Sequence, residues 1–219
     1  MVESLFSMSA QGAHVVTAMF EAELARYTGA PYAVAVDNAS NGLALCLEHE
    51  RVKGITIEIP RNTYPAVPCE IIYAGAKVAF RPQPEPCGLL SGAYQLKPTR
   101  IWDSALKFTH AMYVPGSLMV LSFTGPHKAL KLGKGGAILT DQEATRDWLK
   151  RARFSGRSEC SYHTDEFTQL GHNFYMLPEI AARGLLLMPQ FYNLDGSPRL
   201  MPDITLPYPD LSRFPIYIQ

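Results

Sequence analysis

A single lysine, Lys128, lies between two apolar stretches of the chain, where a turn is expected. The first stretch, residues 118–123, is followed by small and hydroxyl-bearing residues, and the second, residues 137–140, follows a pair of glycines. A lysine fixed on such a turn is partly desolvated, and desolvation lowers a lysine pKa. The neutral amine can then condense with an aldehyde. The alternative is a solvated hairpin lysine, since most lysines lie at the surface.

Polar residues also follow two other predicted strands, at residues 32–36 and 100–102. The first strand runs into a polar segment that opens a helix, and the N–H groups and dipole of a helix start favour a bound phosphate. An ordinary N-cap by Asn38 or Ser40 is the alternative. The second strand ends at Asp103, which is either an acid of a site or the cap of a following helix.

Strands and helices alternate in the first part of the chain. The predicted elements are a helix at 13–28, a strand at 32–36, a helix from about 40, a strand at 55–59, an apolar stretch ending near 73 and a strand at 77–80. This alternation predicts an α/β fold with a mostly parallel sheet. Ligands of such sheets bind beyond the carboxyl ends of the strands. The loops after Val36 and Ile59 are therefore expected at one edge.

The second half of the chain is less regular. Residues 81–99 are rich in proline and glycine and predict an irregular segment. Helices are predicted at 142–154 and from about 178 to 188, separated by a polar loop. Six prolines in the segment from residue 189 to the C-terminus predict an irregular tail, with one strand near 214–218.

The bulk composition limits the class of protein. The chain has 219 residues, 20 basic and 20 acidic, so its zero formal charge gives no sign of a surface for polyanions. The four cysteines have neither CxxC spacing nor a metal-ligand pattern with histidine, and reduced thiols predict a cytoplasmic protein. No apolar run approaches the roughly 20 residues of a membrane span. We therefore expect no metal and no membrane partner, and leave nucleic acid open.

Five segments, in order between about residues 20 and 188, resemble the motifs of one family. They are residues 35–43 (AVDNASNGL), 60–64 (PRNTY), 102–105 (WDSA), 122–136 (SF, K and GG) and 171–176 (GHNFYM). They are similar to the phosphate turn, the P-x-x-T-aromatic, the E-D-A-A, the S-F…K…G-G and the G-x-N-x-R-M motifs of the DegT/DnrJ/EryC1/StrS family of sugar aminotransferases, which depend on pyridoxal 5′-phosphate (PLP).

The resemblance implies roles for individual residues. Lys128 would be the Schiff-base lysine, with Lys131 and Lys134 as alternatives, and Asp103 would pair with the pyridine nitrogen and keep it protonated. Tyr64 would stack on the ring. The residues expected to hold the phosphate are Asn38, Ala39, Ser40, Ser122 and Thr124. Asn173 would reach a phosphate across the interface of a homodimer with a shared active site.

Three positions depart from the family pattern. Ser122 stands six residues before Lys128 instead of five, so Thr124 is expected to share its role. Leu106 replaces the usual Gln or His that contacts the phenolic oxygen of the ring. Tyr175 stands where the family has arginine.

The resemblance also implies a fold: an aspartate-aminotransferase-like (fold type I) large domain, a three-layer α/β sandwich, at residues 1–188. Only 20 residues separate Phe80 from Ile101, too few for the extra β-α units of the family. Residues 189–219 form a proline-rich tail, so we expect the small C-terminal domain to be largely missing. The substrate site would then be open or completed by a second subunit.

The implied activity is transfer of an amine between a small-molecule amine and a carbonyl substrate such as a sugar nucleotide. Two alternatives remain. One is PLP-dependent decarboxylation of an amino-acid-bearing substrate, either free or attached to a modified nucleotide or DNA, because the same lysine, acid and ring serve both reactions. The other is a non-catalytic protein that binds PLP.

Overall fold

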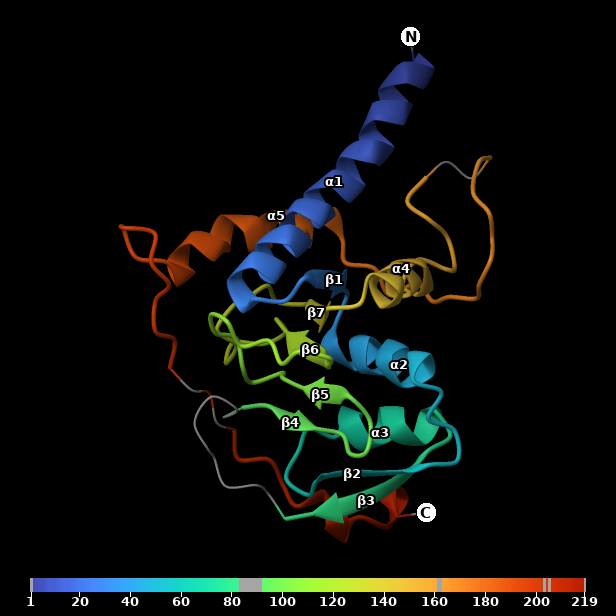
Figure 1. The fold of residues 1–219 in the computed structure, drawn as a ribbon, viewed down its shortest axis with the longest axis vertical. Helices are drawn as coiled ribbons and strands as arrows, with labels where there is room; N and C mark the ends of the chain where they lie inside the picture. Colours follow the sequence, from blue (N-terminus) through green and yellow to red (C-terminus); the bar gives the residue numbers. More distant parts are fainter. Residues whose placement is uncertain (1, 83–91, 161–162, 203, 205, 219) are drawn as a thin grey trace.

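The computed structural model describes residues 2–82, 92–160, 163–202, 204 and 206–218, and only the backbone of residues 2–13. Figure 1 shows the arrangement. The helices are α1 (Val2–Thr28), α2 (Ala39–His49), α3 (Ala66–Tyr73), α4 (Glu143–Ala152) and α5 (Pro178–Leu187). The strands are β1 (Tyr32–Val36), β2 (Thr56–Pro60), β3 (Lys77–Arg81), β4 (Tyr94–Gln95), β5 (Ile101–Asp103), β6 (Leu118–Ser122) and β7 (Gly136–Thr140). Three short 3-10 helices follow α5, at Met188–Phe191, Leu211–Arg213 and Pro215–Tyr217.

The strands form a five-stranded sheet, in the order β1-β7-β6-β5-β4, and a separate parallel pair, β2-β3. Strand β7 is antiparallel to both of its neighbours, β5 is parallel to β6, and β4 is antiparallel to β5. The fold is therefore α/β with a mixed sheet, and the prediction of a mostly parallel sheet was wrong. A loop without a crossover helix joins β6 to β7, so the chain returns in the opposite direction.

The five-stranded sheet is buried on both faces because its strands are apolar at successive positions. In β1, Ala33 and Ala35 belong to one hydrophobic cluster, whereas Val34 and Val36 belong to another. The first cluster contains buried residues of α1 and α5, and the second contains those of α2, α3 and α4. Helices thus cover both faces, and the rim of the strands is left for a site.

Helix α1 packs on α5, and its N-terminal half projects from the body of the molecule (Figure 1). Phe20, which is fully buried, lies against Gly184 of α5, where an added Cβ would come within 2.4 Å of the Phe20 ring. The small residue therefore permits the close approach of the two helices. Helix α1 begins well before residue 13, where the amphipathic pattern placed its start.

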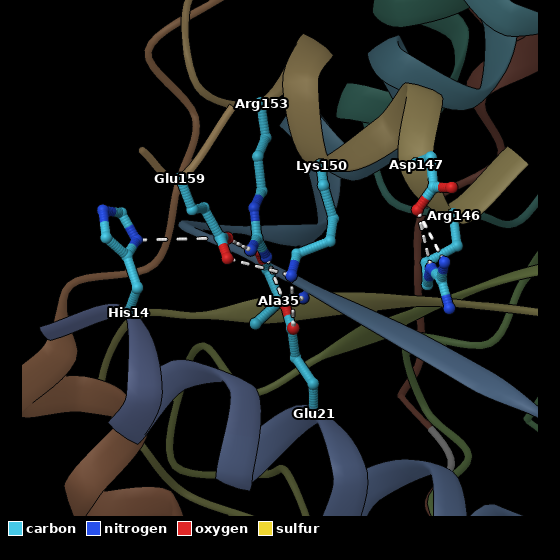
Figure 2. Close-up of polar contacts among 8 residues, drawn as sticks. All are labelled: His14, Glu21, Ala35, Arg146, Asp147, Lys150, Arg153 and Glu159. Carbon is cyan, nitrogen blue, oxygen red and sulfur yellow. Dashed lines mark hydrogen bonds and ion pairs between the residues drawn. The ribbon is translucent and has the colours of Figure 1, made fainter. Parts of the chain in front are cut away.

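A network of buried charges joins α1, β1, α4 and the segment after α4 (Figure 2). The Arg153 guanidinium donates to Glu21, to the Ala35 carbonyl and, at 2.8 Å, to Glu159. Glu21 accepts the Ala35 N–H at 2.8 Å, and Lys150 donates to Glu159 at 3.0 Å. Burial lowers the pKa of Arg153, but Glu21 and Glu159 outweigh this effect and the net pKa is raised. These contacts fix where the chain leaves α4.

The irregular segments differ from expectation in two places. Strand β4 lies in the stretch predicted to be irregular, and the 3-10 helix Pro215–Tyr217 occupies the place of the strand predicted near 214–218. Cys46, Cys69 and Cys160 are free thiols, and Cys87 lies outside the described residues. No helix in the described part of the chain is long and apolar enough to cross a membrane. The same residues contain no cluster of His, Cys, Asp and Glu suited to a metal ion.

Candidate active site

The acid and the amine predicted from sequence meet at one stretch of backbone. Asp103, at the end of β5, is 6% exposed, and its Oδ1 accepts the Ala105 N–H at 2.9 Å. Lys128 comes from the loop between β6 and β7, is half-buried, and its Nζ donates to the Ala105 carbonyl at 2.6 Å. The two side chains are thus anchored on opposite groups of the same residue. The short apolar strands β5 and β6 bring them together because they lie parallel in register.

Burial and mutual attraction act in opposite directions on this pair. Burial lowers the pKa of Lys128, and the negative charge of Asp103 only partly offsets the effect. Burial raises the pKa of Asp103, against the Ala105 N–H, the Tyr94 hydroxyl and the charge of Lys128. Of the two alternative lysines, Lys131 is exposed and Lys134 is 66% exposed. Of these three lysines, Lys128 is the one that is half-buried and has a lowered pKa, which favours a neutral amine.

The predicted phosphate turn lies at the start of α2. Asn38 is the N-cap, and its side chain accepts the Asn41 N–H at 2.9 Å, as the N-cap alternative required. The first N–H groups of a helix, here those of Ala39 and Ser40, have no intrahelical partner. Gly136 of β7 lies against this turn, since an added Cβ would be 2.9 Å from the Ala39 nitrogen. Because Asn38 caps the Asn41 N–H, the N–H groups of Ala39 and Ser40 can still bind an anion.

Ser122 pairs with Gly136 across β6 and β7, and Gly136 in turn lies against the start of α2. The Ser122 hydroxyl is half-buried and accepts the Thr124 N–H at 3.4 Å. Thr124 is exposed, and its hydroxyl both donates to the Gly135 carbonyl and accepts the Gly135 N–H, each at 3.2 Å. Thr124 thus closes the loop that carries Lys128.

Tyr64 and Asn173 lie at the edges of this set. Tyr64 follows β2, is 53% exposed, and its ring meets the Tyr208 ring edge-on at 6.1 Å. Asn173 is exposed and pairs through its backbone with Phe154. Among the described residues, its side chain makes no hydrogen bond to the others of the set. Tyr175, in place of the family arginine, packs its ring on Phe154 at 5.3 Å.

Two tyrosines of this region, Tyr94 and Tyr208, were not singled out from the sequence, and Thr63 was found only as part of the 60–64 motif. The Tyr94 hydroxyl donates to Asp103 Oδ2 at 2.8 Å, and the Thr63 hydroxyl contacts that of Tyr94. Tyr208 lies close enough to Asp103 for its charge to act on the phenol, whose pKa is raised to about 12 mainly by burial. Tyr94 and Tyr208 belong to proline-rich stretches without periodic pattern, so no sequence signal could have found them.

The donor set matches what PLP requires. A buried carboxylate, suited to a basic ring nitrogen, and a partly desolvated amine, suited to an aldehyde, both contact the backbone of Ala105. The helix start, with Gly136 against it, provides N–H groups without bulk for a phosphate. Leu106, half-buried, leaves the phenolic oxygen without the partner that the family supplies. The residues present therefore fit the cofactor apart from this one contact.

Comparisons with known proteins agree with the sequence motifs. Residues 7–86 match the sequence model of the DegT/DnrJ/EryC1/StrS aminotransferase family, which confirms the resemblance over that part of the chain. No curated protein matches the chain in sequence.

Solved structures of aminotransferases share the fold at low identity. The aminotransferase PseC of Helicobacter pylori, involved in the biosynthesis of pseudoaminic acid, is 16% identical with a TM-score of 0.60, and 80% of this chain covers 57% of it. The sugar aminotransferase CalS13 of Micromonospora echinospora is 16% identical with a TM-score of 0.61, and the match covers 80% of this chain and 61% of CalS13. A DegT DnrJ EryC1 StrS aminotransferase of Brucella abortus is 20% identical with a TM-score of 0.61, and the match covers 80% of this chain and 58% of the Brucella chain. The chain spans less than two thirds of the length of these structures.

Proposed function

We propose that this chain is a PLP-dependent aminotransferase in which Lys128 holds the cofactor as a Schiff base. The observation that carries the proposal is the convergence of Lys128 and Asp103 on the two sides of Ala105, within an aminotransferase fold. The family match over residues 7–86 supports the same activity. The fold assignment that goes with it is a type I large domain of three layers at 1–188, followed by a tail at 189–219.

Each residue has a task that follows from its chemistry. The Asp103 carboxylate would accept a hydrogen bond from the protonated ring nitrogen and so keep the proton on that nitrogen, and the protonated ring would supply an electron sink when PLP is bound. Lys128 would hold the aldehyde of the cofactor and, as a free amine of lowered pKa, would be the base that takes and returns a proton at the substrate carbon. Tyr64 covers the ring face. The phosphate ligands are Asn38, Ala39, Ser40 and Ser122, with Thr124 shaping the loop.

The substrate is proposed to be a sugar-nucleotide or similar carbonyl compound. The relatives named as sugar aminotransferases support this class. The proposal includes a homodimer, because Asn173 is exposed and is free to enter the site of a second subunit. The exposed amide of Asn173 could contact a phosphate only if a second subunit placed its own phosphate site next to it.

The test is to trap the cofactor. The purified protein is incubated with PLP, its visible absorbance is recorded, and borohydride reduction is followed by peptide mass spectrometry. We expect a yellow species and a pyridoxyl group on Lys128, and neither in Lys128→Ala. Lys131→Ala, at an exposed lysine of the same loop, is the matched control and should retain both. A colourless wild-type protein, or a label spread over surface lysines, would refute the assignment.

A further inference from the structure

Tyr94 holds the carboxylate on which the proposed site depends. It lies in the two-residue strand β4, which pairs antiparallel with β5 so that Tyr94 faces Asp103 in register. Its hydroxyl donates to Asp103 Oδ2 at 2.8 Å, while the Ala105 N–H donates to Oδ1 at 2.9 Å. Each oxygen of the carboxylate therefore has a fixed donor, and the plane of the group is set by the two contacts.

The direction of the hydrogen bonds follows from counting protons. A phenol has one proton, and that of Tyr94 goes to Asp103. In its contact with Thr63 the Tyr94 oxygen must then accept, so the Thr63 hydroxyl donates. Thr63 is 2% exposed and directly precedes Tyr64, the residue proposed to cover the ring. A chain of donors thus runs from Thr63 through Tyr94 to Asp103, and each bond polarises the next.

The surroundings keep the Tyr94 proton in place. Burial raises the pKa of Tyr94 well above its ordinary value, and the negative charge of Asp103 raises it further. Tyr94 is therefore a donor throughout the neutral range. The other titratable groups that act on Asp103 or Tyr94 are Lys128, whose charge favours the carboxylate, and Tyr208, a neutral phenol of raised pKa.

We propose that Tyr94, supported by Thr63, is a positioning residue that keeps Asp103 ionised and aimed at the cofactor ring. This role rests on the proposed function. Burial alone favours the neutral acid, and a neutral acid cannot hold the ring nitrogen in its protonated form. The Tyr94 hydrogen bond opposes that effect, because a donor to the charged form of a carboxyl group stabilises the charge.

The experiment compares Tyr94→Phe with wild type in two measurements. The first is the ionisation of Asp103 in the protein without added cofactor, followed by carbon-13 NMR of labelled aspartate carboxyls. We expect the pKa of Asp103 to rise when the hydroxyl is removed. The second is the affinity for PLP, which should fall by about tenfold or more, as expected for loss of a hydrogen bond to a charged group. The visible absorbance band of the PLP-bound variant should also titrate at a different pH from that of the PLP-bound wild-type protein.

Two further variants separate positioning from general damage. Tyr113→Phe removes another half-buried phenol, which donates to the Ser117 carbonyl at 3.0 Å away from the site, and should change neither measurement. Thr63→Val removes only the donor behind Tyr94 and should produce a smaller change of the same sign; it also serves if Tyr94→Phe fails to fold.

The outcomes distinguish this inference from the proposed function. An Asp103 pKa that is unchanged in Tyr94→Phe, or in Thr63→Val if only that variant folds, overturns the positioning role. This result counts whether or not the protein binds PLP. A wild-type protein that fails to bind PLP, with the Asp103 pKa still dependent on Tyr94, overturns the cofactor assignment alone.

Discussion

Replacing Arg153 by methionine should destabilise the protein far more than replacing a surface arginine. Arg153 is 2% exposed and neutralises Glu21, which is 7% exposed, and Glu159. Removal of one partner of a buried pair leaves an uncompensated charge, a cost of about 3–5 kcal/mol. Lys150, 3.9 Å from Glu21, can offset only part of this cost. The free energy of unfolding should therefore fall by about 3 kcal/mol or more.

The same helix offers a matched control. Arg146 in α4 pairs with Glu143 and Asp147, whose side chains are 67% and 57% exposed, so Arg146→Met should cost about 1 kcal/mol or less. Figure 2 shows both arginines. Denaturant unfolding, followed by circular dichroism, measures the two changes. Equal losses for the two variants would refute the reasoning from burial.

A second substitution tests whether the cost arises from the stranded charge. In Arg153→Met with Glu21→Gln, the amide oxygen can still accept the Ala35 N–H, and no negative charge remains at that position. The double variant should therefore be more stable than Arg153→Met alone by about 1 kcal/mol or more. If the double variant is the less stable of the two, lost packing and not lost charge compensation explains the effect.

Two further changes should have measurable results. Burial raises the pKa of Glu159, but Arg153 and Lys150 outweigh it and the net pKa lies below 4.5; the stabilisation is thus complete above about pH 4.5 and is lost as the pH falls through the lower folded value. Urea unfolding across this range should show a shallower acid dependence in Glu159→Gln, and an unchanged slope would contradict the assignment. Gly136→Ala places a Cβ 2.9 Å from Asn38 and Ala39 backbone atoms, so it should cost about 1–3 kcal/mol in thermal unfolding and weaken inorganic phosphate binding. Wild-type phosphate affinity in this variant would argue against an anion site there.

The elements that the sequence predicted well have unbroken local patterns. β1 was predicted at residues 32–36 and found there, because an apolar run between a glycine–proline stop and a polar turn leaves little freedom for its bounds. The antiparallel direction of β7 could not be predicted, since strand direction depends on which neighbour the chain meets and not on the strand's own residues. β4 has only two residues and is held by pairing with β5.

The same distinction applies to the candidate site. Lys128 and Asp103 could be found because each ends or follows an apolar strand, and a strand end has a defined place at the rim. Tyr94 and Tyr208 approach Asp103 through contacts between segments without periodicity, so only the assembled chain shows them. Burial of Asp103, which decides its ionisation, also depends on these distant segments.

The C-terminal tail contacts the segment that follows β2, beside the candidate site, although the two are far apart in the sequence. Asn62 donates to the Tyr208 carbonyl, 146 residues away, at 3.0 Å, and the Leu211 N–H donates to the Arg61 carbonyl at 2.8 Å. Beyond Phe191 the described residues form only short 3-10 helices, so the tail depends on its contacts with the rest of the chain, including the buried Leu211. This strap should consequently dock late in folding and detach first in the native state, well before the sheet opens. Detachment would uncover Tyr64 and hydrate the neighbourhood of Asp103 while the rest of the protein stays folded.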